Sequence, residues 1–221
     1  MPSRRSLPLL LLLASCRAHT PPPPAAEASG AFAAAAGVVR ADTSGRAHRI
    51  IPLGRMSGDV EILYGDPEKA GEPFVMRIRE LPGSIIPLHS HPVDEHITVV
   101  QGTWYFAVGE RWDSTALGEL TPGTYAFAPA GSTMYGASPD GAVVQVHGVG
   151  PFHIHWKHGL ATLDDSAGAA TFRYRKGDRV RTPRGAGVIL QGYASGTLIQ
   201  YEIEGDSAGR FMTSESDVRR M

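Results

Sequence analysis

The chain has 221 residues but only one cysteine, Cys16. A disulfide scaffold is therefore excluded. Charge is scarce and balanced, because charged residues make up 19% of the chain and the formal net charge is −1. This balance excludes a general nucleic-acid-binding surface. No stretch approaches the roughly 20 apolar residues that a spanning helix needs, so a multi-span membrane protein is excluded as well.

The sequence is rich in glycine, proline and histidine, with 26, 17 and 9 residues. So much glycine and proline is typical of a chain rich in turns, and the length suits one or two domains with a hydrophobic core.

The N-terminus has the pattern of an export signal. Arg4 and Arg5 form a positive start, a short apolar run follows at 7–13, and this run is too short to cross a bilayer. Leu13-Ala14-Ser15-Cys16 resembles the bacterial lipobox, in which the cysteine is lipidated and becomes the first residue of the mature protein. We therefore expect a signal peptide at 1–15. An ordinary secretory signal with a chance cysteine is the alternative.

Several acyl chains on Cys16 would anchor the protein stably to a membrane. The resemblance thus implies an exported bacterial lipoprotein that faces the periplasm or the cell exterior. Residues 16–45 are rich in proline and alanine, which predicts a stiff linker between the membrane and the folded part.

Residues 46–160 are predicted to form one all-β domain. Short β-rich runs, separated by glycine and proline, recur here without a long amphipathic helix, which favours an antiparallel sandwich or barrel. The runs are Val75–Arg79, His96–Val100, Trp104–Val108, Thr124–Ala128 and Val143–Val149.

Three candidate metal ligands lie between Gly83 and Gly102. His89 and His91 share one face of a strand because the side-chain period of a strand is two. Glu95 opens the next predicted strand and can face the same interior. Two imidazoles and one carboxylate suit Fe(II), Mn(II), Zn(II) or Ni(II).

The spacing G-x5-H-x-H-x3-E-x6-G in this segment resembles the first motif of the cupin family. Residues 123–134 resemble the second motif, except that Met134 stands where the family usually has its last histidine ligand. The resemblance implies a jelly-roll barrel with a metal site in its mouth.

Met134 leaves three arrangements open. The site keeps three protein ligands and more open coordination positions, it recruits another histidine, or it has lost the metal and become a binding pocket. A thioether suits copper better than Fe, Mn or Zn, so copper is the expectation if Met134 coordinates.

Four further residues are candidates for the site. Alternation places Gln145 and His147 on one face and their valine neighbours on the other, so the polar pair either lines the cavity or faces solvent. Tyr135, beside Met134, is a candidate for reaching the mouth. His96 should point away from Glu95, and His153, His155 and His158 fit a packed or surface strand better than a ligand set.

Two functions follow from this region. One is a metal-dependent enzyme of the dioxygenase or isomerase type acting on a small organic molecule, for which the sequence identifies no catalytic base. The other is a non-catalytic cupin that binds or senses a small molecule. The family's habit of pairing through barrel edges adds the expectation of a homodimer.

The C-terminal part is predicted to be a linker at 161–171 and a small β domain at 172–221. The latter resembles a five-stranded tudor-like barrel. Six basic residues lie between Arg173 and Arg184. Because export makes nucleic acid an improbable partner, lipid headgroups, cell-wall polymer or a protein are the expected partners, unless this is simply a solvated face.

Overall fold

The computed structural model describes residues 59–165 and 172–221, all of which fall within one compact unit. The predicted signal peptide at 1–15, the whole predicted linker at 16–45 with Cys16, and the first residues of the predicted all-β domain, 46–58, lie outside these residues. In the described part, regular structure consists of β-strands and two short 3-10 helices, Ser114–Ala116 and Glu215–Asp217. No helix in that part is long and apolar enough to cross a membrane. The prediction of an all-β fold is confirmed.

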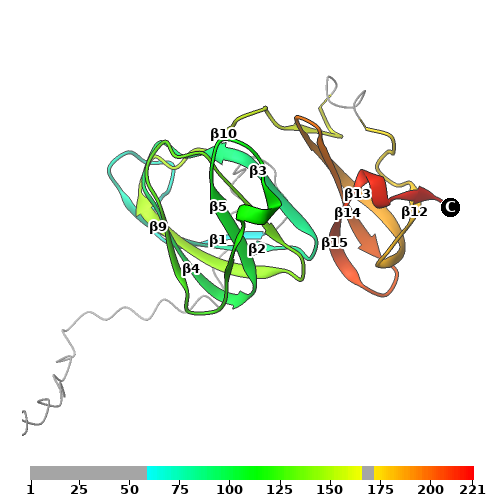
Figure 1. Ribbon diagram of the computed structural model, residues 1–221, viewed down its shortest axis with the longest axis horizontal. Helices are drawn as coiled ribbons and strands as arrows, with labels where there is room; N and C mark the ends of the chain where they lie inside the picture. Colours follow the sequence, from blue (N-terminus) through cyan, green and yellow to red (C-terminus); the bar gives the residue numbers. More distant parts are fainter. Residues whose placement is uncertain (1–58, 166–171) are drawn as a thin grey trace, which may run out of the picture. The chain divides into compact units, whose positions relative to one another are not determined.

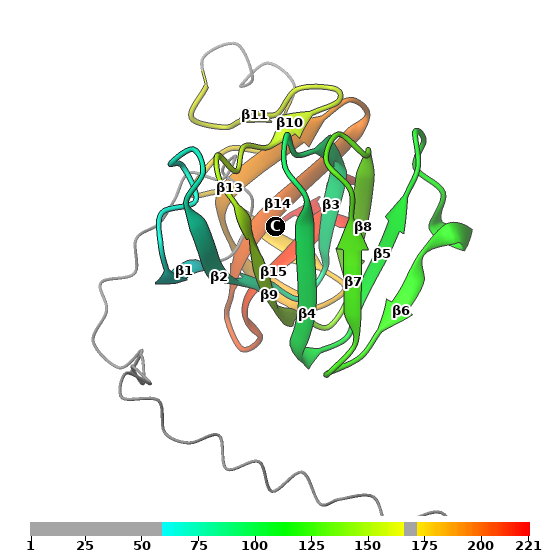
Figure 2. The same cartoon turned by 90° about the vertical axis from the view of Figure 1, so that its left-hand side faces the viewer.

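Ten strands form two five-stranded antiparallel sheets (Figures 1 and 2). The first sheet has, in order, β1 (Asp59–Tyr64), β2 (Pro73–Glu80), β9 (Ala142–Val149), β4 (Glu95–Gly102) and β7 (Tyr125–Ala128). The second has β10 (His155–Trp156), β3 (Ser84–Ser90), β8 (Met134–Ser138), β5 (Trp104–Val108) and β6 (Gly118–Leu120).

The path of the chain through these two sheets is that of a jelly roll. The chain alternates between the sheets from β2 to β5 and again from β7 to β9, so that strands distant in sequence become neighbours. The resulting orders β2-β9-β4-β7 and β3-β8-β5-β6 are the two four-stranded sheets of a double Greek key. All five strands predicted from the sequence lie at the expected positions.

The core of the jelly roll follows from strand alternation. Met76, Ile97, Val144 and Val146 are each no more than 2% exposed and pack together between the sheets. Most of their sequence neighbours are more exposed. Burial of one face of each strand fixes the register, because a slip of one residue would turn the apolar side chains to solvent.

The backbone conformation of Gly102 explains why the first motif ends in glycine. Gly102 ends β4 with φ +74°, and a Cβ at this position would lie 2.2 Å from the carbonyl oxygen of Gly141. A larger residue would therefore meet backbone on the neighbouring strand, in a conformation that only glycine adopts readily.

The C-terminal residues form a third antiparallel sheet. Its strands are β15 (Gly209–Ser214), β14 (Leu198–Gly205), β13 (Gly185–Ser195), β12 (Arg179–Thr182) and β16 (Arg219–Arg220), in that order, with β11 (Ala161–Thr162) paired to β13. The strands confirm a β-rich C-terminal part, and its likeness to a tudor barrel stays a prediction.

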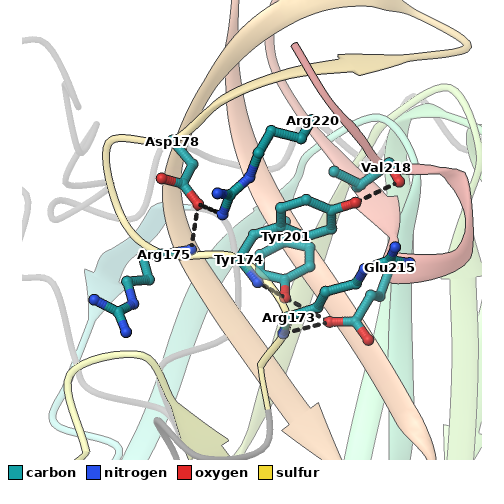
Figure 3. A network of polar contacts seen from close by, with 8 residues as sticks. All are labelled: Arg173, Tyr174, Arg175, Asp178, Tyr201, Glu215, Val218 and Arg220. Atoms are coloured by element: carbon teal, nitrogen blue, oxygen red, sulfur yellow. Dashed lines mark hydrogen bonds and ion pairs between the residues drawn. The ribbon is translucent and has the colours of Figure 1, made fainter.

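Two tyrosine hydroxyls link β14 and the segment before β12 to the segment that follows β15 (Figure 3). The hydroxyl of Tyr201 donates to Glu215 Oε2 at 2.5 Å and accepts from the backbone N–H of Tyr174 at 3.1 Å. The hydroxyl of Tyr174 donates to the carbonyl oxygen of Val218 at 2.9 Å. Both rings are buried, so these bonds satisfy polar groups that water does not reach.

Candidate metal centre

The three predicted ligands come together at the connection between β3 and β4. His89 lies near the end of β3, His91 follows directly after it, and Glu95 is the first residue of β4. Their exposed fractions are 8%, 3% and 6%. The two imidazole ring centres are 5.0 Å apart, and His91 Nε2 lies 3.6 Å from Glu95 Oε2. The fold thus gathers two imidazoles and one carboxylate in a buried region.

Both imidazoles are oriented by backbone carbonyl groups. His89 Nδ1 lies 2.7 Å from the carbonyl oxygen of Pro87, and His91 Nδ1 lies 2.8 Å from that of His153. A carbonyl oxygen only accepts, so Nδ1 carries the hydrogen in both rings. The lone pair of each ring is then on Nε2, which is the tautomer that a metal-binding histidine held by a second group adopts.

Burial controls the protonation of all three groups. It lowers the pKa of His89 to about 4, and burial together with the nearby His89 lowers the pKa of His91 to about 3. Burial raises the pKa of Glu95 to about 8. Although His91 and Glu95 are within ion-pair distance, these directions favour the neutral forms of both at pH 7, so the contact is not a salt bridge at that pH.

Two aromatic residues that the sequence analysis did not select support the imidazoles. Phe152 stacks on His91 with ring centres 4.0 Å apart, and Trp156 lies 5.2 Å from His89. The only sequence signal for them is the alternation of aromatic and histidine residues. Phe152 belongs to the core, whereas His153 and His155, which follow it, are exposed, as expected for a strand at the surface.

The second motif is hydrogen bonded to the first. The backbone N–H of Gly131 donates to the carbonyl oxygen of His91 at 2.8 Å, and that of Ala130 donates to Asp94 Oδ1 at 2.8 Å. Met134 is the direct cross-strand partner of His89 and is 2% exposed. The residue at the position of the family's last histidine therefore lies beside the first predicted ligand.

The donor chemistry of these residues fits a divalent cation, because imidazole nitrogens and carboxylate oxygens are common ligands of divalent transition metals. In the part of the chain that the structure describes, no three His, Cys, Asp or Glu side chains are close enough as they stand to hold an ion. The carboxyl group of Glu95 and the two imidazoles nevertheless share one buried region.

Gln145 and His147 lie on the outer face of the first sheet, away from the core. Gln145 Oε1 accepts from Arg77 Nε at 3.4 Å, and the exposed His147 stacks on His96 with ring centres 4.9 Å apart. Val144 and Val146, which alternate with them along β9, face the core instead. This corrects the expectation that Gln145 and His147 line the cavity, and it agrees with the solvent-facing alternative.

Tyr135 also faces away from the predicted ligands. It is buried in a separate cluster with Leu88 and Ala107, and its hydroxyl donates to the carbonyl oxygen of Asp113 at 3.2 Å. Alternation along β8 explains this, because Met134 and Tyr135 are neighbours and so point to opposite faces. The expectation that Tyr135 reaches the mouth is corrected accordingly.

Acidic residues offset part of the basic run in the C-terminal sheet. Arg179 forms two hydrogen bonds with Asp206, at 2.9 and 2.7 Å. Arg184 lies 3.9 Å from Asp140, and Lys176 lies 3.9 Å from Asp164. These pairs are exposed and therefore contribute little to stability. They give half of the six basic residues an acidic neighbour, so the predicted partners for this run stay a prediction.

No protein-family model matches the sequence, and no curated protein matches it. Similar solved structures include a protein of unknown function with a cupin-like fold from Ralstonia eutropha JMP134, with 27% identity and a TM-score of 0.36 over 44% of this chain and 57% of that one. The DMSP lyase DddQ from Ruegeria pomeroyi DSS-3 shows 20% identity and a TM-score of 0.36 over 42% of this chain and 47% of that one.

A protein with a double-stranded β-helix domain from Klebsiella pneumoniae subsp. pneumoniae MGH 78578 shows 17% identity and a TM-score of 0.37, over 49% of this chain and 98% of that one. The chain spans about half the length of the first two structures. Similarity at this level does not show an activity.

Proposed function

We propose that this protein is a cupin that holds one divalent metal ion through His89, His91 and Glu95 and acts on a small organic molecule. The observation that carries the proposal is the anchoring of both Nδ1 atoms to backbone carbonyl groups. This anchoring leaves two Nε2 lone pairs in a buried region that also contains a carboxylate. Metal-binding histidines are commonly held in this tautomer by a second group.

A bound divalent cation supplies Lewis acidity, which polarises an oxygen atom of the substrate. The chain's own residues orient and shield the site. Phe152 fixes the plane of the His91 ring by stacking, and Trp156 lies against His89. Met134 offers a thioether in place of a fourth imidazole, which leaves coordination positions open for the substrate. Oxygenation and isomerisation are the reaction types that fit this arrangement. Neither the sequence nor the fold identifies a catalytic base.

The alternative is a non-catalytic cupin that binds a small molecule without metal. The observation that favours it is the present separation of the donors, because no three of the described side chains are close enough to hold an ion. The two functions differ in the metal content of the purified protein.

Elemental analysis of tag-free protein distinguishes them. We expect close to one equivalent of a divalent transition metal in the wild type, and a loss of most of it in His89→Ala and in Glu95→Ala. His96→Ala is the matched control, since it removes an imidazole one residue from Glu95 but on the outer face of the same strand. A folded wild type that neither contains nor takes up metal would support the non-catalytic alternative.

We further propose, from the sequence alone, that the protein is exported and anchored by lipid at Cys16. Mass spectrometry of the native protein tests this, because acylation at Cys16 adds the mass of the attached chains, and cleavage of the Ser15–Cys16 bond removes residues 1–15. A native protein that retains residues 1–15, or begins at another residue, would contradict it.

A further inference from the structure

A cavity lies outside the jelly-roll interior. It has a volume of about 640 Å³ and lies between β3, the loop at 110–112 and the turn that joins β13 to β14. Gln200 of β14 supports this arrangement, since its side chain accepts from the backbone N–H of Ile85 at 3.0 Å and donates to the carbonyl oxygen of the same residue at 2.7 Å. The volume is in the range of small-molecule sites.

The lining of the cavity is largely apolar. Ile85, Leu88 and Leu198 contribute to it, together with the indole of Trp112. Trp112 is 41% exposed, and its ring lies 5.0 Å from that of the buried Tyr135, so the indole is held in place although one side is open. The cavity therefore offers a fixed apolar surface.

One charge in the lining is in no ion pair. Arg111 forms no hydrogen bond or salt bridge with any residue that the structure describes. Its neighbour Glu110 is bound by Lys157, which also donates to the carbonyl oxygen of Glu110 at 2.7 Å. Asp113, the next acid along the chain, interacts with the charge of Arg111 at longer range, while its carboxylate accepts from Thr115 N and Oγ1 at 2.8 and 2.6 Å. The exposed guanidinium group of Arg111 is therefore open to an anion in the cavity.

A buried hydroxyl group in the lining also lacks a partner. Ser195 is 6% exposed, and no group in the described chain forms a hydrogen bond with its Oγ. A buried polar atom without a partner costs free energy. Its Oγ is closed to water as it stands, so the side chain would rotate toward the cavity to form a hydrogen bond with a ligand.

We propose that this cavity binds a small carboxylate with an apolar body. The carboxylate group pairs with Arg111, the apolar body lies on Leu88 and Leu198, and the hydroxyl of Ser195 bonds to an oxygen atom of the ligand. Guanidinium groups bind carboxylates through two parallel hydrogen bonds, which explains the preference for this anion. The site is separate from His89, His91 and Glu95, so its occupation does not depend on the proposed metal.

Calorimetric titration with octanoate tests this proposal, with octan-1-ol and octylammonium as probes of the same chain length. We expect octanoate to bind the wild type, octan-1-ol to bind more weakly, and octylammonium to bind weakest. Arg111→Gln should weaken octanoate at least about tenfold and leave octan-1-ol unchanged, because it removes the charge but keeps a polar side chain. Arg175→Gln is the matched control, since Arg175 is an exposed arginine outside the cavity lining.

A second variant tests the apolar surface. Leu198→Trp fills part of the cavity and should weaken octanoate and octan-1-ol alike, while its thermal unfolding shows that the protein still folds. His89→Ala should leave octanoate binding unchanged, so failure of the metal proposal and failure of this one are distinguishable. Absence of octanoate binding to the wild type, or equal binding to Arg111→Gln, would overturn the proposal.

Discussion

Met134 lies directly opposite His89 on the neighbouring strand, and both side chains are buried. Directly opposed residues of an antiparallel pair project to the same face of the sheet, where their Cβ atoms are close together. The thioether is therefore placed where a further ligand would stand, although it is a poor donor for Fe, Mn or Zn.

The variant Met134→His tests this placement. A fourth donor next to His89 should raise the affinity for Zn²⁺ at least about tenfold, measured by competition with a chromophoric chelator. Met134→Leu, which keeps the volume without the sulfur, should bind Zn²⁺ like the wild type. His147→Ala should also leave the affinity unchanged, because His147 faces outward. An unchanged affinity in Met134→His would show that the fourth position lies elsewhere.

Glu80 makes the stability of the protein depend on pH. Burial raises the pKa of its carboxyl group from 4.5 to about 7, and its Oε2 atom has no hydrogen-bond partner among the described residues. Below pH 4.5 the group is protonated in both the folded and the unfolded chain, so it contributes nothing. Between pH 4.5 and 7 only the unfolded chain ionises, so stability falls as the pH rises, by about 3 kcal/mol in all.

Glu80→Gln should remove this fall, because glutamine has no proton to lose. Urea unfolding at pH 4 and pH 8 measures the effect. The variant should match the wild type at pH 4 and exceed it at pH 8, whereas Glu204→Gln, at an exposed position, should follow the wild type at both. Equal stability of Glu80→Gln and wild type at pH 8 would contradict the account.

Tyr201 stabilises the C-terminal sheet through its hydroxyl group. Tyr201→Phe removes the acceptor of the Tyr174 N–H and the donor to Glu215 and leaves a buried polar group unpaired. We expect a loss of about 1–3 kcal/mol in the free energy of unfolding. Tyr105→Phe, whose hydroxyl makes only a long 3.4 Å contact with Glu119, should lose less than about 0.5 kcal/mol. Similar losses in both variants would show that the network is not the cause.

The sequence predicted the strands better than it predicted the surroundings of His89, His91 and Glu95. The strands followed from alternation and from glycines such as Gly102, whose positive φ a turn requires. Alternation also divides β9 into two faces, but it does not say which face is inside. The sequence therefore leaves open whether Gln145 and His147 line the cavity or face solvent, and the packing of Val144 and Val146 in the core places them on the outer face.

Contacts between distant segments could not be read from the sequence. The register shift between Ile86 and His89 alters the alternation along β3, and no residue pattern predicts this shift. The carbonyl group of His153 and the ring of Phe152 reach His91 from a segment about 60 residues further along the chain. Such support depends on the path of the backbone in three dimensions rather than on residue type.

The most direct test of the metal proposal is a crystal structure of Zn²⁺-loaded protein with anomalous diffraction data recorded at the zinc edge. We predict one strong peak at about 2.0–2.2 Å from Nε2 of His89, Nε2 of His91 and a carboxylate oxygen of Glu95. A peak bound instead by His96 and His147 on the outer face, or no peak near the β3–β4 connection, would contradict the account.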